Sequence, residues 1–139
     1  MQKKGDNKDS LKAARIYFNG IQNMINHRRH KRVPIMGTVT LKFKDKGDFR
    51  SIQALPGSIS LKGLGLYVDD PIADDTNVST TINFMSFEGI KPVSIEASVV
   101  YSKNIGSLYF MGIQFKEEIN SEKHYLLYEH MQKILALNK

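Results

Sequence analysis

Cysteine and tryptophan are both absent from this chain of 139 residues. Without cysteine, the chain has neither a disulfide framework nor a thiolate metal site. No apolar run approaches the ~20 residues that a membrane-spanning helix requires, and the opening stretch, MQKKGDNKDS, is polar and lacks the apolar core of a signal peptide. We therefore expect a cytoplasmic protein with no membrane span. A chain of this length buries enough surface to fold without a metal or a disulfide.

Common catalytic motifs are missing as well. The sequence contains no nucleophile elbow, Walker loop or HExxH motif. The aspartates at 69–75 lack the spacing and the closing glutamate of a calcium-binding loop, and the cationic neighbours of His27 and His30 would repel a metal ion. His124 and His130 are expected to be surface or packing residues of the last helix. We expect a binding protein that is not an enzyme and holds no cofactor.

Positive charge is present, but it is concentrated in one part of the chain. The net charge is +6. Residues 1–50 contain 13 Lys or Arg against 4 Asp or Glu, which gives +9, whereas residues 51–139 contain 7 against 10, which gives −3. The densest run is HRRHKR at 27–32. A local field of one sign attracts phosphates, acidic surfaces or anionic lipid headgroups.

The N-terminal part is predicted to be a polar lead followed by an amphipathic helix, together residues 1–26. Apolar residues recur every three or four positions after a plausible Ser10 cap, and they form one stripe on a helix: Leu11, Ala14, Phe18, Ile21 and Ile25. The helix is expected to end near the basic run, because Pro34 favours an extended conformation at Val33.

Residues 27–139 are predicted to form one mainly β domain. After Pro34 the apolar period becomes two, as in Val39, Leu41 and Phe43. Further runs at 49–55, 58–68, 78–85, 93–101 and 108–115 are separated by turn residues. Six strands without intervening helices predict an antiparallel β-barrel or sandwich. Helical spacing returns from about Asn120 to Leu137, with Ser121 or Asn120 as the expected cap. This last helix is expected to pack on the β domain or on a second copy of the chain.

Two short clusters are candidate binding residues. Arg28 and Arg32 precede a segment that must straighten before Pro34, so their guanidinium groups are placed to converge on one ligand, with paired donors for a phosphate or a guanine edge. The alternative is a solvated charge cluster at a helix end. Ser58 and Ser60 are predicted to lie on one face of an extended strand, with Gly63 allowing close approach of a ligand. The alternative there is an ordinary polar face followed by a glycine turn.

The combination of these clusters resembles the PilZ family of cyclic di-GMP receptors. That family has an RxxxR motif, a [D/N]xSxxG motif on an early strand and a closing strand that often reads GxxF. The segments RRHKRVP, SISLKGLGL and ASVVYSKNIGSLYFMGIQF follow this order over about residues 27–118. The first motif is matched by Arg28 and Arg32, the second by Ser60 and Gly63, and the third by Gly112 and Phe115.

The resemblance implies a six-stranded antiparallel β-barrel with a trailing helix, in bacteria, that binds cyclic di-GMP. It also implies ligand contacts from both clusters: Arg28, Arg29, Arg32, Ser58, Ser60 and Gly63. One position departs from the pattern, because Ser58 stands where the family has Asp or Asn. If a guanine donor is left unpaired there, binding weakens by ~1–3 kcal/mol.

Three functions follow, in decreasing order of preference. The first is a receptor whose arginine arm becomes ordered on binding cyclic di-GMP and which signals through its helices to a partner protein of the motility, pilus or polysaccharide machinery. The second is a PilZ-like adaptor that acts through protein contacts without the dinucleotide. The third is a nucleic-acid-binding barrel, disfavoured because the strands show few exposed aromatic residues in an obvious stacking pattern and tryptophan is absent. Homodimer formation is left open.

Overall fold

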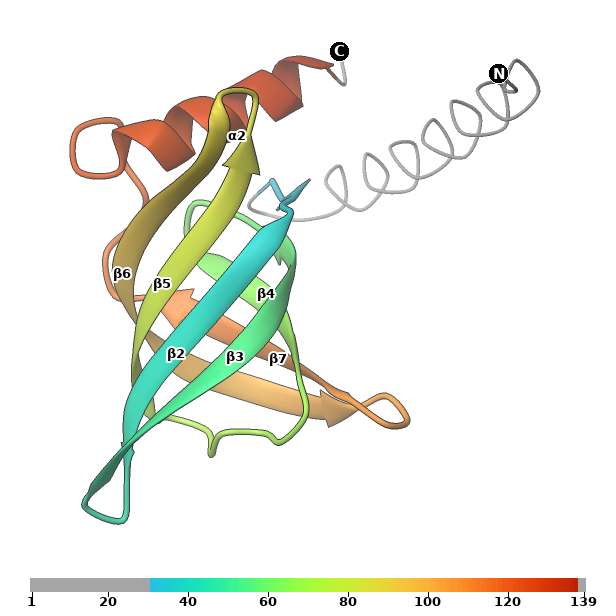
Figure 1. The fold of residues 1–139 in the computed structure, drawn as a ribbon, viewed down its shortest axis with the longest axis vertical. Coiled ribbons are helices and arrows are strands. Elements are labelled where there is room, and N and C mark those ends of the chain that lie inside the picture. The colour runs from blue at the N-terminus through green and yellow to red at the C-terminus, as the bar shows by residue number, and fades with distance from the viewer. Residues whose placement is uncertain (1–30, 138–139) are drawn as a thin grey trace.

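Seven β-strands and one α-helix make up residues 31–137, the part of the chain that this computed structural model describes (Figure 1). The predicted helix at 10–26, together with Arg28 and Arg29, lies outside the described residues. The elements are β1 Val33–Pro34, β2 Gly37–Asp45, β3 Asp48–Ile59, β4 Gly63–Val68, β5 Asn77–Ser86, β6 Gly89–Asn104, β7 Tyr109–Phe115 and α2 Tyr125–Leu137.

Six of the strands form a closed ring of antiparallel pairs. The sheet order is β1-β3-β2-β5-β6-β7-β4, and β4 also pairs with β3, which joins the two ends of the six longer strands. The two-residue strand β1 adds to the end of β3, with Val33 opposite Ile59 and Pro34 opposite Ser58. The prediction of a mainly β, six-stranded antiparallel fold is confirmed in this form.

The core lies inside the ring because apolar residues alternate along each strand. In β2, Val39, Leu41 and Phe43 are buried, as their period of two predicted. The helix α2 crosses one end of the ring and adds Leu127 and Met131 to the same core (Figure 1). Among the described residues, no helix is long and apolar enough to cross a membrane.

The run at 58–68, predicted as one strand, is two elements. Ser58 and Ile59 end β3, and β4 starts only at Gly63. The amide of Ser60 donates to the carbonyl oxygen of Gly63 at 2.9 Å, which closes a tight turn between the two strands. The prediction that Ser58 and Ser60 share one strand face is therefore wrong. Periodicity did not reveal this turn because serine and glycine are compatible with both a strand and a turn.

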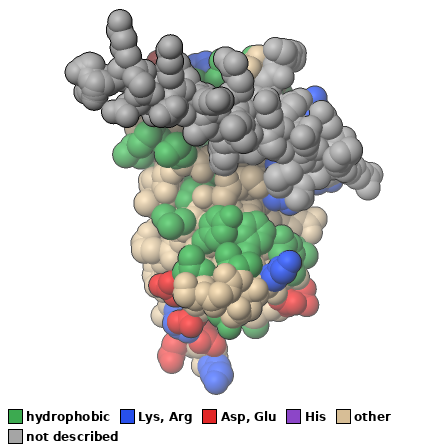
Figure 2. Space-filling model, turned by 90° about the vertical axis from the view of Figure 1, so that its right-hand side faces the viewer, with side chains coloured by type: hydrophobic (Ala, Val, Ile, Leu, Met, Phe, Trp, Pro, Cys, Tyr) green, Lys and Arg blue, Asp and Glu red, His purple; other side chains and the backbone are tan. Residues whose placement is uncertain are grey.

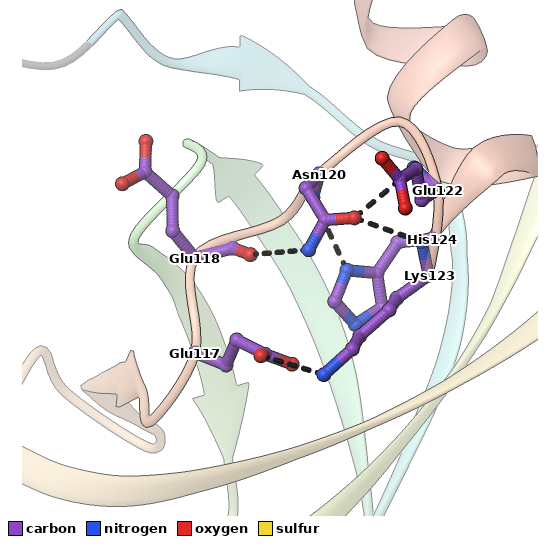
Figure 3. A network of polar contacts seen from close by, with 6 residues as sticks. All are labelled: Glu117, Glu118, Asn120, Glu122, Lys123 and His124. Carbon is purple, nitrogen blue, oxygen red and sulfur yellow. Dashed lines mark hydrogen bonds and ion pairs between the residues drawn. The ribbon is translucent and has the colours of Figure 1, made fainter.

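The C-terminal helix starts later than predicted, at Tyr125, after a turn at residues 121–124. Asn120 is nevertheless the capping residue (Figure 3). Its Oδ1 accepts hydrogen bonds from the amides of Glu122 at 3.0 Å and Lys123 at 2.8 Å. Nδ1 of His124 accepts a hydrogen bond from the amide of Asn120 at 3.2 Å, so the segment before α2 is fixed from both directions.

Candidate functional site

Arg32 and Ser58, from the two predicted clusters, lie together. β1 pairs with the end of β3, with Pro34 opposite Ser58, so Arg32 lies diagonally across from Ser58. Nη1 of Arg32 donates to Oγ of Ser58 at 3.5 Å, at the long limit for a hydrogen bond. Both residues are half-buried. A guanidinium group and a hydroxyl, which are 26 residues apart in the sequence, thus form one polar site at the end of β3.

Ser60 contributes to the shape of this site. Its Oγ accepts hydrogen bonds from the amides of Lys62 and Gly63, both at 3.2 Å, and the residue is only 4% exposed. The hydroxyl therefore stabilises the turn that follows Ser58. A direct contact between Ser60 and a ligand stays a prediction.

Gly63 is required by the close approach of two strands. A Cβ atom at this position would lie 2.5 Å from the carbonyl oxygen of Ile113 in β7. Any side chain would push β4 away from β7 and disturb the strand that follows the turn. The packing of β4 against β7 therefore requires glycine at position 63, in addition to its predicted place in the binding motif.

Three aromatic rings gather on the outer surface of the ring of strands. Tyr67, Phe110 and Tyr101 come from β4, β7 and β6, and we call them the aromatic face. The centroids of Tyr67 and Phe110 are 5.2 Å apart in an edge-to-face arrangement, and those of Tyr101 and Phe110 are 6.2 Å apart. Tyr67 is 36% exposed and Tyr101 is 41% exposed. Figure 2 looks at this side of the molecule and shows hydrophobic side chains gathered on it.

Glycines form the floor beneath these rings. A Cβ on Gly65 would meet the ring of Phe110, and one on Gly112 would overlap the ring of Tyr101. The strand register aligns Ser58, Gly65, Gly112 and Tyr101 across four neighbouring strands. At roughly 4.8 Å per strand, this row extends about 14 Å from the serine to the tyrosine. The result is a shallow surface with a cation at one end and exposed ring faces at the other.

The sequence did not predict that these three rings lie together. Tyr67, Phe110 and Tyr101 are separated by up to 43 positions, and only the pairing register brings them together. Alternation gave a signal for Tyr67 and Phe110, which follow or precede the buried residues Leu66 and Met111 and are therefore placed outside. It gave none for Tyr101, which stands two positions after the buried Val99 and faces outward because the register shifts between them. Alternation along one strand predicts which side of the sheet a residue faces, but not which residues lie beside it on the neighbouring strands.

A cavity lies at the end of the ring of strands that is opposite α2. It has a volume of about 530 Å³ and lies between the β2–β3 turn and the loop at 69–76. Its charged residues have both signs: Lys44, Asp45, Lys46, Arg50, Asp69 and Asp70. Mixed charge of this kind does not favour an anion. Among residues 31–137, no group of three or more His, Cys, Asp or Glu side chains is placed to hold a metal ion.

The described residues form a small antiparallel β domain with a cationic, glycine-rich and aromatic outer surface. The model of the PilZ domain matches residues 26–133. The chain therefore belongs to the PilZ domain family, as the sequence motifs indicated. No curated protein matches the chain.

Several solved structures have a similar fold. Bacillus subtilis inhibitor of motility, MotI/DgrA, is 17% identical with a TM-score of 0.57, over 79% of this chain and 52% of that one. The K. pneumonia MrkH–c-di-GMP complex is 17% identical with a TM-score of 0.56, over 80% and 54%. The PilZ domain of Escherichia coli YcgR with c-di-GMP is 16% identical with a TM-score of 0.50, over 80% and 91%. The chain thus spans about half the length of MotI and MrkH.

Proposed function

We propose that this chain is a receptor for cyclic di-GMP. Support comes from its membership of the PilZ family and from structural neighbours that were solved with c-di-GMP bound. The single observation that carries the proposal is the contact between Arg32 and Ser58 beside the glycine floor. It joins the last arginine of the RxxxR motif to the strand end that carries the second motif.

In this proposal the arginines hold the anionic part of the ligand. The hydrogen bond from Arg32 to Ser58 is long, and a phosphate oxygen or the O6 and N7 edge of guanine is a stronger acceptor for a guanidinium group than a serine hydroxyl. Arg28 and Arg29 precede it in the basic run and are proposed to supply further donors. Binding of the dinucleotide orders this arm across the outer surface.

The aromatic face is proposed to receive a purine. The exposed ring of Tyr101 lies on the glycine row that begins at Ser58. Stacking of a base on an aromatic side chain contributes roughly 1–3 kcal/mol. A ligand with two phosphates and two guanines matches a surface that has a cation at one end and rings at the other.

The proposed output is a change in the direction of the chain before Arg32. Because the arm connects residues 1–26 to the ring of strands, a ligand that fixes the arm also fixes what precedes it. A protein partner would then recognise this change in direction, or would bind the surface of α2. Neither step includes catalysis.

A ligand-independent adaptor is the second candidate, and one observation favours it. Ser58 replaces the acidic or amide residue of the motif, and the hydroxyl of Ser60 is already used by the turn. This chain therefore offers a guanine fewer hydrogen-bond acceptors than a motif that begins with Asp or Asn. Pull-down of one partner in equal amounts with and without cyclic di-GMP would support the adaptor.

Isothermal titration calorimetry with cyclic di-GMP tests the receptor. The unmodified chain is expected to release or absorb heat in a saturable titration. Arg32→Ala is expected to weaken binding at least about tenfold, because a hydrogen bond to a charged group contributes roughly 1.5–3 kcal/mol. Arg50→Ala is the matched control, since Arg50 lies at the opposite end and pairs with Asp45. Absence of heat, or equal affinity in all three proteins, would overturn the proposal.

A further inference from the structure

A second hydrophobic surface lies at the end of the ring that carries α2, and the proposed ligand site does not use it. Met85, Phe87 and Ile90 surround the tip of the β5–β6 hairpin and are 52%, 68% and 67% exposed. Tyr125 and Leu126 from the first turn of α2 are 58% and 45% exposed. We call these five residues the end surface. So many large apolar side chains in two adjacent elements indicate an interaction site.

A groove runs between the hairpin tip and the helix. It is lined by Phe87, Tyr125, Leu126, Glu129, His130 and Lys133, among others, and encloses about 70 Å³. The ring of His130 packs against Phe84 and Phe87 at 5.1 and 6.1 Å between centroids. The hairpin and the helix are therefore joined below the groove, and they present one continuous surface.

The described chain begins at this same end. The helix α2 contacts β1, which starts at Val33. The carbonyl oxygen of Met36 accepts a hydrogen bond from the amide of Met85 at 2.9 Å, so the segment after β1 lies beside the end surface. Met36 itself is 68% exposed. The 30 residues before Lys31 are thus attached close to this surface.

Those 30 residues contain a sequence pattern that needs an apolar partner. The stripe at 10–26 predicts an amphipathic helix about 25 Å long at 1.5 Å per residue. An isolated helix of this length is marginal in water, and packing of its apolar stripe supplies most of its stability. The four residues at 27–30, which connect this segment to the described chain, span up to about 14 Å when extended. The tether is therefore long enough to return the stripe to the end surface.

We propose that residues 10–26 dock as a helix on the end surface, with the stripe that includes Phe18, Ile21 and Ile25 against Phe87 and Leu126. Tethering gives this segment an effective concentration in the millimolar range, which favours it over a second copy of the chain at ordinary protein concentrations. The basic run at 27–32 then connects a docked helix to β1 and stays at the end of β3 where Ser58 lies. This docking does not depend on the proposed ligand.

Disulfide trapping in the full chain tests the docking, because the chain has no cysteine of its own. Leu126→Cys is combined in turn with Phe18→Cys, Ile21→Cys and Ile25→Cys, so that one pair meets the strict geometry of a disulfide. The matched control carries the same N-terminal cysteines with Phe49→Cys, which is 84% exposed at the opposite end of the ring. We expect a disulfide within one chain for at least one Leu126→Cys pair and for no Phe49→Cys pair.

Three results of this trapping would overturn the proposal. The first is that no disulfide forms with Leu126→Cys, and the second is that disulfides form at equal rates with Leu126→Cys and with Phe49→Cys. The third is that disulfides form only between two chains, because a second copy of the chain would then occupy the end surface.

Hydrogen exchange gives a second measurement that needs no cysteine. Amides at 10–26 are expected to exchange at least about tenfold more slowly in the unmodified chain than in a Phe87→Ser, Ile90→Ser double variant. Phe49→Ser is the control and should leave this protection unchanged. Equal exchange at 10–26 in all three proteins would overturn the docking, while calorimetry with cyclic di-GMP separately decides the proposed function.

Discussion

At the scale of the residue, Ser58 is the position where this chain departs from the family motif and where we expect the proposed affinity for cyclic di-GMP to be most readily changed. The side chain has one hydroxyl, which accepts from Arg32 at 3.5 Å. A hydroxyl offers a shorter reach and fewer acceptor sites than a carboxylate. The affinity for cyclic di-GMP should therefore respond to what replaces this serine.

Ser58→Asp is predicted to tighten cyclic di-GMP binding by about tenfold, because a carboxylate adds charge-assisted hydrogen bonds to the guanine edge. Ser58→Ala, which offers no acceptor, should bind no better than the unmodified chain. Calorimetric titration of the three proteins measures both effects. Weaker binding by Ser58→Asp than by Ser58→Ala would show that the motif position does not face a guanine here.

Gly37 is the residue whose replacement is predicted to destabilise the fold most clearly. Its φ is +139°, and a Cβ would overlap the carbonyl oxygen of Asn83 in β5. Gly37→Ala should lower the free energy of unfolding by roughly 2–5 kcal/mol, from backbone strain and overpacking together. Gly47→Ala has a positive φ but open space around it, so only about 1 kcal/mol is expected. Urea unfolding compares the two, and equal losses would contradict the steric argument.

At the scale of the element, α2 depends on its cap and on a buried histidine. The cap is Asn120, whose side chain accepts from two amides before the helix (Figure 3). The nearby ion pair between Lys123 and Glu117 is 2.8 Å long but exposed. Exposed pairs of this kind contribute little because water and salt screen them.

Asn120→Ala is predicted to lower the free energy of unfolding by about 1 kcal/mol, the usual loss for a capping residue. Asn120→Asp should retain most of the stability, since it keeps the acceptor. Lys123→Ala is the control and should change the urea midpoint very little. If Lys123→Ala lowers the free energy of unfolding more than Asn120→Ala does, the ion pair and not the cap stabilises this segment.

His130 gives the fold a dependence on pH. Burial, and to a lesser extent Lys133, lowers its pKa below the ordinary value of 6.5. The unfolded chain then binds this proton at a higher pH than the folded chain, so stability is complete above about pH 6.5 and decreases as the pH falls below it. We expect the melting temperature to fall between about pH 7.5 and about pH 5.5. In His130→Phe, which keeps a ring against Phe84, the fall should be smaller; an equal fall would contradict this role.

At the scale of the whole molecule, alternation and turn residues predicted the strands well but not their junctions. The runs at 39–43 and 78–85 became β2 and β5 because each has one buried face. The run at 58–68 was wrongly predicted as one strand, because the four-residue turn that the Ser60 hydroxyl stabilises has a composition that is also compatible with a strand. The start of α2 was placed early because the cap, Asn120, precedes a turn before the helix.

The candidate site was predictable only where it is local in sequence. The resemblance to PilZ proteins named Arg32, Ser58 and Gly63, and the structure brings Arg32 to Ser58. The aromatic face was not predictable, because it depends on which strands are neighbours around the ring. No single segment contains that information, since the pairing of β4 with both β3 and β7 is a property of the closed sheet.

Cyclic di-GMP is proposed to bind on the outer surface of β3, β4 and β7, beside Arg32. NMR spectra of the ¹⁵N-labelled full chain, recorded during a titration with cyclic di-GMP, show where the ligand binds. We expect the largest shifts upon ligand addition at the amides of Gly57, Ser58, Gly65 and Gly112. Shifts confined to the loops at 44–50 and 69–76 at the opposite end, or no shifts at saturating ligand, would contradict it.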